Sequence, residues 1–184
     1  KSANELQDVP ASLRYMVDQF SAVPAYIYDE KMNVLAWNRL AEEVFGPFET
    51  AHPYGRNLIW RMFMLPSHRT LYPEWESLAK SMLDHFRPMY VRNLENPWYK
   101  EFIAELKEGC AKVAEWWDYY GVQCTHRHPH VVEHPKAGRL HLEPQIMHIE
   151  EQKLYLNVFI PNLNDGSDRR LAVLSEKEGA KVHS

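Results

Sequence analysis

The segment RLHLEPQIMHI-EEQ-KLYLNVFI, residues 139–160, decides the fold. In both halves of this segment apolar residues alternate with polar ones, which is the period of a β-strand with one buried face. We therefore predict strands over residues 139–149 and 153–160. The link of three residues between them is short enough to make the two strands antiparallel neighbours. A third strand is predicted over residues 122–133, joined to the first by a turn that contains proline and glycine.

Two more strands and a series of helices precede this segment. Residues 25–29 and 33–37 are short apolar runs, and the polar link between them predicts a hairpin. Apolar residues then recur every three to four positions, which indicates amphipathic helices. The chain is therefore predicted to be one α+β domain, in which a five-stranded antiparallel sheet has helices packed on one face. Such an arrangement leaves room for a cavity between sheet and helices.

Proline residues are expected to delimit the middle helices. Pro66 should end the helix that precedes it, and Pro73 should lie in the first turn of the next helix. Pro88 should end or kink that helix, because proline has no N–H and its ring clashes with the preceding turn. A last helix should begin at Pro97 and end at Gly121.

Three parts are expected along the chain. Residues 1–23 form an N-terminal helix and linker, with apolar side chains at helical spacing over residues 13–20. Residues 24–165 form the main domain, and residues 166–184 form a tail with a short helix. Asn38 is well placed to cap a helix in the main domain by accepting a backbone N–H. The chain begins without Met, so we expect a fragment of a longer protein.

Composition and charge exclude several classes of protein. The chain has 184 residues, of which 45% are hydrophobic and 25% are charged, the ordinary mix of a globular domain. No apolar run approaches the roughly 20 residues of a membrane-spanning helix, so no membrane association is expected. The net charge of −4 has the wrong sign for a domain that holds a phosphate backbone alone. Cys110 and Cys124 form no disulfide framework, and a reducing cytoplasm is the expected location.

A cluster of cations, methionines and large rings is the first candidate site. Methionine is flexible and suits the wall of an adaptable apolar cavity. Arg56 or Arg61 could hold a carboxylate in a two-pronged grip. The alternative is that the same residues form ordinary core with surface cations. The candidate ligand-binding residues are Tyr26, Trp37, Arg56, Asn57, Trp60, Arg61, Phe63, Met64, Tyr72 and Trp75.

The histidines offer a weaker alternative, a metal-dependent enzyme. The stretch HVVEH, residues 130–134, matches the H-x-x-E-H pattern, but that pattern needs a helix, and the valines and flanking prolines predict a strand. His126 and His128 would point the same way from a strand, and with His141 or His148 they could hold zinc. Motifs for a nucleophile, a phosphate loop or a dinucleotide are missing from the sequence, so we expect neither an enzyme nor a cofactor.

Three ordered groups of residues resemble the MmyB-like transcription regulator ligand-binding domain. The first is PAYIYD at residues 24–29 followed by VLAWNR at 34–39. The second is RNL at 56–58 followed by LYPEWE at 71–76. The third comprises His134-Pro135, Gly138-Arg139-Leu140 and residues 154–161, which fall where that family has its closing hairpin. The likeness covers about residues 13–175.

The resemblance implies a PAS-like domain of a regulator that contacts DNA through a separate Cro/repressor-type helix-turn-helix domain. It also implies a small apolar or fatty-acid-like effector in the cavity between sheet and helices, and we expect a homodimer. The alternative is an interaction module without a small ligand, whose cavity is filled by its own side chains and which dimerises through the sheet or the helix at 13–20. Pro144 departs from the family's pattern, and we expect a bulge or an edge there.

Overall fold

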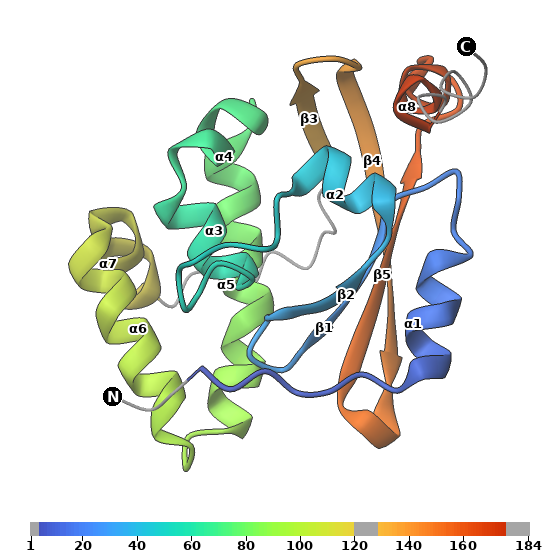
Figure 1. Cartoon of the computed structure of the whole chain (residues 1–184). Helices are drawn as coiled ribbons and strands as arrows, with labels where there is room; N and C mark the ends of the chain where they lie inside the picture. Colours follow the sequence, from blue (N-terminus) through green and yellow to red (C-terminus); the bar gives the residue numbers. More distant parts are fainter. Residues whose placement is uncertain (1–3, 120–128, 176–184) are drawn as a thin grey trace.

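Five antiparallel strands form one sheet at the centre of the molecule (Figure 1). The computed structural model describes residues 4–119 and 129–175 and gives the strand order β2-β1-β5-β4-β3. The strands are β1 (Ala25–Asp29), β2 (Val34–Trp37), β3 (His130–His134), β4 (Gly138–Ile149) and β5 (Leu154–Pro161). The α+β class and the PAS-like sheet are therefore confirmed. The third strand was predicted over residues 122–133. The structure describes its end as β3, and residues 122–128 lie outside the described residues.

Helices α2 to α7 cover one face of the sheet, as predicted, and α1 lies against part of the other face (Figure 1). We call these the helix face and the back face. Helix α8 packs near the end of β5 and contacts β4. The helices are α1 (Ala11–Asp18), α2 (Arg39–Phe45), α3 (Leu58–Met64), α4 (Pro66–Leu71), α5 (Trp75–Arg92), α6 (Pro97–Gly109), α7 (Ala111–Trp117) and α8 (Ser167–Ser175), with a 3-10 turn, η1 (Glu150–Gln152), between β4 and β5.

The predicted turns between strands have simple local causes. Asp29 closes the β1–β2 turn, because its Oδ1 accepts hydrogen bonds from the backbone N–H groups of Lys31 and Asn33 at 3.0 and 2.9 Å. Gly138 has a φ of 79° at the start of β4, a conformation that glycine adopts without steric strain. Lys153 takes the left-handed conformation between η1 and β5. The strands that these turns join are antiparallel, as expected.

Among the described residues, Pro144 has a partner strand on one side only. It faces Phe159 of β5, and the pairing of β4 with β5 runs without a bulge from Leu142 to Ile149. On the other side, the described part of β3 reaches only as far as the His130–Leu142 pair. No bulge interrupts the pairing of β4 with β5 at Pro144, and a residue without an N–H suits a position whose only partner strand in the described residues is β5.

Three helix boundaries differ from the prediction. Pro66 does not only end a helix but also begins α4, a helix that the sequence did not suggest. Pro88 lies inside α5, which continues to Arg92. A proline costs a helix interior about 3 kcal/mol, and the buried side chains of Phe86 and Met89 on either side of it offset this cost. The helix predicted from Pro97 is split, because Cys110 is extended and separates α6 from α7.

Asn38 caps α2 as predicted and does more than that. Its Oδ1 accepts the N–H groups of Ala41 and Ala25 at 2.9 and 3.0 Å, and its Nδ2 donates to the carbonyls of Phe20 and Val23. It therefore joins the end of the α1 segment, the start of β1 and the start of α2. Within the described residues, no helix has the length and apolar character needed to cross a bilayer.

Candidate functional site

A small cavity lies between the helix face of the sheet and helices α3, α4 and α5. Its volume is about 20 Å³, which is enough for about one water molecule. Five of its lining side chains are apolar, and the other five carry a hydroxyl, an imidazole or a guanidinium. The lining residues are Tyr26, Phe45, Phe48, Leu58, Arg61, Met62, His68, Tyr72, Met82 and His130.

The Arg61 side chain supplies the positive charge of this cavity. It is 1% exposed, and its guanidinium donates to the carbonyls of Phe45, Pro47 and Gly55 at 2.7–2.8 Å. Within the part of the chain that the structure describes, it forms no ion pair with a carboxylate. Burial lowers the pKa of Arg61, because removing a charge from water is costly. Buried charges in proteins are normally paired, so a buried cation of this kind indicates a place for an anionic partner.

Two histidines flank the Tyr72 ring. The ring centroids of His68 and His130 lie 5.6 and 6.2 Å from that of Tyr72, each with edge-to-face geometry. Burial lowers the pKa of His130 to about 4, and burial together with the Arg61 charge lowers the pKa of His68 to about 4, so both are neutral at pH 7. Both Nδ1 atoms are buried and have no hydrogen-bond partner among the described residues. They are free to bond a polar group placed in the cavity.

The two tyrosine hydroxyls in the cavity wall stay protonated. Burial raises the pKa of Tyr26 and Tyr72, and the Arg61 charge opposes this shift only in part. A neutral hydroxyl can both donate and accept a hydrogen bond. The cavity therefore combines a cation, two neutral imidazoles and two hydroxyls with walls of methionine, leucine and phenylalanine. Such a combination suits a molecule with one polar end and an apolar body.

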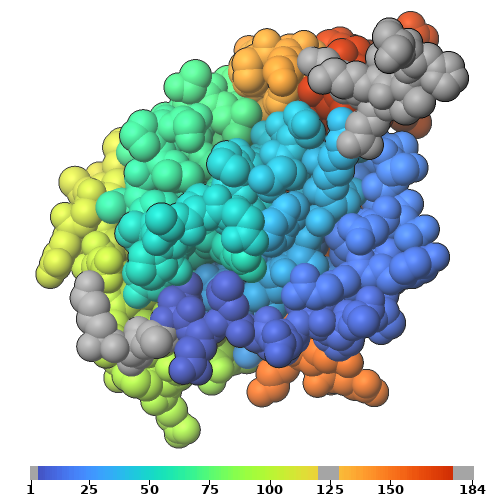
Figure 2. Space-filling view, in the orientation of Figure 1, coloured from blue at the N-terminus to red at the C-terminus, as the bar shows by residue number. Residues whose placement is uncertain are grey.

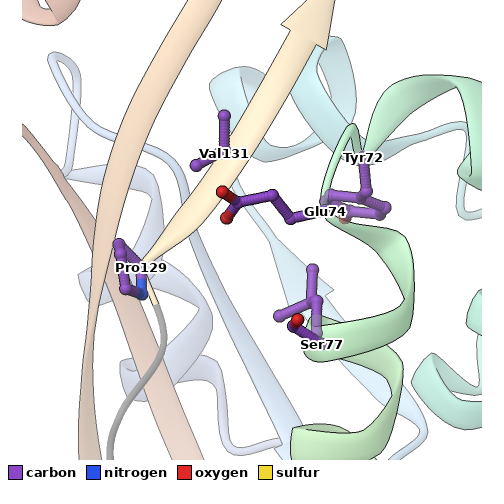
Figure 3. A pocket seen from close by; sticks show the side chains of 6 residues that line it. Tyr72, Glu74, Ser77, Pro129 and Val131 are labelled. Carbon is purple, nitrogen blue, oxygen red and sulfur yellow. The ribbon is translucent and has the colours of Figure 1, made fainter.

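A second hollow lies on the other side of Tyr72, between the start of α5 and β3 (Figure 3). Its volume is about 10 Å³, and its walls include Glu74, Ser77, Pro129 and Val131. Tyr72 follows α4 directly and lines both hollows. The two small hollows thus share the Tyr72 side chain.

The family model that matches this chain is the MmyB-like transcription regulator ligand binding domain, over residues 9–174. The chain belongs to this family. A comparison with curated proteins gives no match. Membership in the family makes the chain a ligand-sensing regulatory domain, and that family is not a known family of enzymes.

In this ligand-binding domain the ten predicted site residues do not share one place. Tyr26, Arg61 and Tyr72 line the cavity. Three others lie toward the loop that joins α2 to α3. Arg56 lies over the Trp37 ring at 5.0 Å and pairs with Glu49, and Trp60 stacks on His52.

The remaining four predicted residues have packing or capping contacts. Phe63 and Trp75 meet edge to face at 5.6 Å and both contact Trp116 of α7, while the Trp75 indole donates to the Met62 carbonyl. Met64 approaches Gly109 at the end of α6. Asn57 is fully buried and caps α3, because its Oδ1 accepts the N–H groups of Ile59 and Trp60 at 3.0 Å.

Seven of the lining residues were not among the predicted site residues. The apolar ones were assigned to helix stripes or passed over, because helical spacing shows that a side chain is buried but not that it borders a void. His68 was missed because α4 was not expected. A proline at the first position of a helix is common, so Pro66 was the signal that could have placed His68 on a helix facing the sheet.

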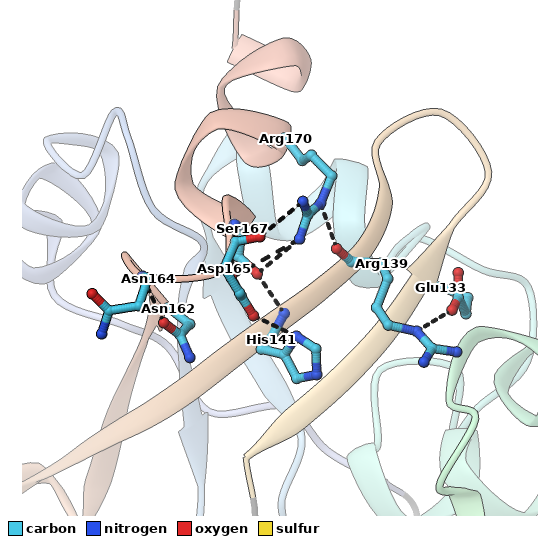
Figure 4. Close-up of polar contacts among 8 residues, drawn as sticks. All are labelled: Glu133, Arg139, His141, Asn162, Asn164, Asp165, Ser167 and Arg170. Atoms are coloured by element: carbon cyan, nitrogen blue, oxygen red, sulfur yellow. Dashed lines mark hydrogen bonds and ion pairs between the residues drawn. The ribbon is translucent and has the colours of Figure 1, made fainter.

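The histidines proposed as metal ligands are only partly described. His126 and His128 lie outside the described residues. His141 Nδ1 lies 2.7 Å from Asp165 Oδ2, in a group of polar contacts with Ser167 and Arg170 that fixes the start of α8 (Figure 4). His148 stacks on Tyr155. No three potential metal ligands come together in residues 4–119 and 129–175.

Proposed function

We propose that this domain senses a small amphipathic acid, of the fatty-acid type, bound in the cavity between the sheet and helices α3 to α5. The observation that carries the proposal is the buried Arg61 guanidinium, which in the described residues donates hydrogen bonds only to backbone carbonyls, lies over the Phe48 ring at 4.7 Å and has no carboxylate in ion-pair contact. Buried charges in proteins are normally paired. A carboxylate at this place would supply the missing charge.

The other polar groups of the cavity fit the same ligand. Three of the five N–H groups of Arg61 are used by carbonyls, which leaves others for a ligand. The Tyr72 hydroxyl can donate to a carboxylate, and a neutral imidazole of His68 can donate from Nδ1 in the appropriate tautomer. Hydrogen bonds to a charged group contribute about 1.5–3 kcal/mol each, so these side chains would orient the acid end.

The apolar body of the ligand requires the cavity to widen. Met62 and Met82 are flexible gap-fillers, and Leu58 is half-buried, so these walls can move at low cost. Each methylene that leaves water contributes about 0.8 kcal/mol. A medium-length acyl chain therefore gains enough to offset the repacking of three or four side chains. The hollow beyond Tyr72 extends the space in the direction of β3.

A comparison of two ligands and two variants tests this proposal. Thermal unfolding is followed with dodecanoic acid and with dodecanol, which has the same chain but no charge. We expect the acid to raise the unfolding midpoint by several degrees and the alcohol to have a smaller effect, because only the acid pairs with Arg61. The Met82→Trp variant fills the cavity and should abolish the shift, whereas Met147→Trp, on the exposed back face, should retain it.

Native mass spectrometry after gentle purification gives an independent measurement. We expect a bound molecule with the mass of a fatty acid. A protein that carries no small molecule and gains no stability from any chain length between eight and sixteen carbons would contradict the proposal. Equal shifts of the unfolding midpoint with the acid and the alcohol would contradict only the role of Arg61 as the carboxylate partner, and not the binding of an apolar molecule.

The domain would act on DNA through a separate helix-turn-helix domain, since its own net charge of −4 does not favour a phosphate backbone. We propose a homodimeric regulator of the cytoplasm, in which occupancy of the cavity changes the equilibrium between two arrangements. Occupancy can do so only if the two arrangements differ in their affinity for the effector.

The small volume of the cavity favours a second candidate, an interaction module without a small ligand. In that case the exposed apolar side chains of α1, Tyr15 and Met16, would form the contact between two copies. Light scattering after size exclusion distinguishes the two candidates. A Tyr15→Ser, Met16→Ser double variant that becomes monomeric, in a protein that binds no fatty acid, would support the second candidate.

A further inference from the structure

Three asparagine side chains form a continuous chain of amide hydrogen bonds. Asn57 Nδ2 donates to Asn33 Oδ1 at 3.2 Å. Asn33 and Asn4 bond each other reciprocally, since Asn33 Nδ2 donates to Asn4 Oδ1 at 2.9 Å and Asn4 Nδ2 donates to Asn33 Oδ1 at 3.3 Å. These residues are 24 and 29 positions apart in the sequence, so the contacts join three separate parts of the domain.

One end of this asparagine chain holds the helix that lines the cavity. Asn57 caps α3 through Ile59 and Trp60, and its Nδ2 also donates to the Lys31 carbonyl at 2.7 Å. Helix α3 contributes Leu58, Arg61 and Met62 to the cavity wall. A shift of α3 that widens the cavity would therefore move Asn57.

The other end holds the N-terminal strap, residues 4–9, against the domain. Asn4 Nδ2 donates to the Pro53 carbonyl at 2.8 Å, and Gln7 Nε2 donates to the Gln152 carbonyl at 3.0 Å. Val9 is buried against the back-face core. Figure 2 shows the strap in deep blue, beside the residues around position 50. The strap thus has two polar anchors, of which only Asn4 connects to α3.

Burial differs along the asparagine chain and determines where it breaks. Asn33 and Asn57 are fully buried, so a lost partner leaves a buried polar atom unsatisfied. Asn4 is half-buried and can exchange its partner for water. The two bonds to Asn33 Oδ1, at 3.2 and 3.3 Å, are near the upper limit of hydrogen-bond length, so both are weak links of this chain. The bonds between Asn33 and Asn4 are the ones nearest the solvent, where water can replace the partner that leaves.

We propose that the Asn57–Asn33–Asn4 chain couples occupancy of the cavity to release of the N-terminal strap at Asn4. This inference rests on the proposed function, because it needs a ligand that moves α3. Release of the strap is then the structural response to ligand binding. Both the bound ligand and the attached strap affect the position of α3.

Coupling of this kind is reciprocal, which gives a direct test. If the ligand weakens the Asn4–Asn33 pair, then removing the pair must strengthen ligand binding by the same factor. We expect Asn4→Ala to bind dodecanoic acid about 2- to 10-fold more tightly than the unmodified protein in calorimetric titration, the range set by the loss of one or two hydrogen bonds. The matched control is Gln7→Ala, which removes the other anchor and should leave the affinity unchanged.

The side-chain amide signals of Asn4 and Asn33 provide the second measurement. They are assigned in 1H–15N spectra by comparison with Asn4→Ala, and saturation with dodecanoic acid should increase the solvent exchange of the Asn4 amide protons. If dodecanoic acid binds with equal affinity to the Asn4→Ala variant and the unmodified protein, the coupling is refuted and the proposed function stands. If the unmodified protein binds no fatty acid of eight to sixteen carbons, both are refuted. A Gln7→Ala variant with the same gain as Asn4→Ala would also refute the coupling, because it would show a general loosening of the strap.

Discussion

The two faces of the sheet are built from different kinds of side chain. The buried back-face core is entirely aliphatic and consists of Val9, Val17, Ala25, Ile27, Leu35, Ala36, Leu154, Leu156 and Val158. The helix-face core contains most of the buried rings, and beside them lie a buried arginine and a buried histidine. One strand serves both, since in β1 Ile27 points to the back face and Tyr26 and Tyr28 point to the helix face.

This difference in composition suggests that the back face supports the sheet and that the helix face contains the adaptable cavity. Short aliphatic side chains on a pleated surface pack in few ways and leave no polar atom to satisfy, so the back face fixes the position of α1 and the strands. The helix face contains rings, methionines and unpaired polar atoms, whose packing can change in response to a guest. The cavity lies where the packing is adaptable, and the sheet behind it is held from the other side.

The largest expected effect comes from the charged group of the helix face. Arg61→Met should lower the free energy of unfolding by about 3–5 kcal/mol, because three buried carbonyls lose their donor. The control is Arg56→Met, which removes an arginine that pairs with the exposed Glu49 and should cost less than about 1 kcal/mol. Urea denaturation measures both. Similar losses for the two variants would show that Arg61 is not the structural centre of this face.

The sequence offered Arg56 and Arg61 as candidates for the carboxylate partner. In the structure, Arg61 is buried and Arg56 is partly exposed. The pattern of charge and apolar residues placed both near one cavity, but it could not tell which one pointed inward, because α3 begins only at Leu58. Arg56 precedes the helix and turns to Trp37, whereas Arg61 is in its second turn and faces the sheet. Strands β1, β2, β4 and β5, in contrast, were predicted to within one residue at each end, because a period of two leaves few alternatives once one face is buried.

The helices show a second limit of the sequence. Apolar spacing located α5 and α6, but their ends depended on how much packing a proline or a break could recover. Pro88 is tolerated since its neighbours are buried, and Cys110 interrupts a pattern that looked continuous. The cavity depends on α4, which has six residues and too few apolar positions to show a period. Of the predicted site residues, Tyr26, Arg61 and Tyr72 line this cavity.

Truncation of one leucine on each face compares their rigidity. Leu35→Ala, on the back face, should cost about 3 kcal/mol, because a tightly packed aliphatic site collapses poorly around a void. Leu58→Ala, at the half-buried wall of the cavity, should cost about 1 kcal/mol, because water and the neighbouring methionines can fill the space. Denaturant midpoints measure the difference. A larger loss for Leu58→Ala would reverse the assignment of rigid and adaptable faces.

Acid should loosen the helix face selectively. The pKa of His68 is lowered to about 4 from the 6.5 of an exposed histidine, so its contribution is complete above pH 6.5 and is lost as the pH falls toward 4. A shift of this size corresponds to about 3 kcal/mol at pH 4. His68→Leu should therefore match the unmodified protein's pH slope above pH 6.5 and lose less stability below it.

A group with the opposite sign must be separated from this effect. The pKa of Asp29 is raised to about 6 by burial, so its carboxylate costs stability at pH 7 and this cost disappears as the pH falls from 6 toward 3.8. The difference between the pH profiles of His68→Leu and the unmodified protein cancels the Asp29 contribution, since both proteins contain it. A flat difference profile between pH 4 and 6.5 would contradict the neutral, buried state of His68.

The smallest expected effect tests how easily the helix layer adapts. A Cβ at Gly109 would meet the Met64 Cε, which is the free end of a flexible side chain. Alanine gains roughly 1 kcal/mol over glycine in a helix, and a rotation of the Met64 methyl offsets part of that gain. Gly109→Ala should thus change the free energy of unfolding by less than about 1 kcal/mol.

The matched change on the back face, Ala36→Val, adds volume among fixed aliphatic neighbours and should cost about 1–3 kcal/mol. Equal losses in thermal unfolding would mean that the methionine beside Gly109 is as constrained as the back-face core, and the adaptable region would then be confined to the immediate wall of the cavity.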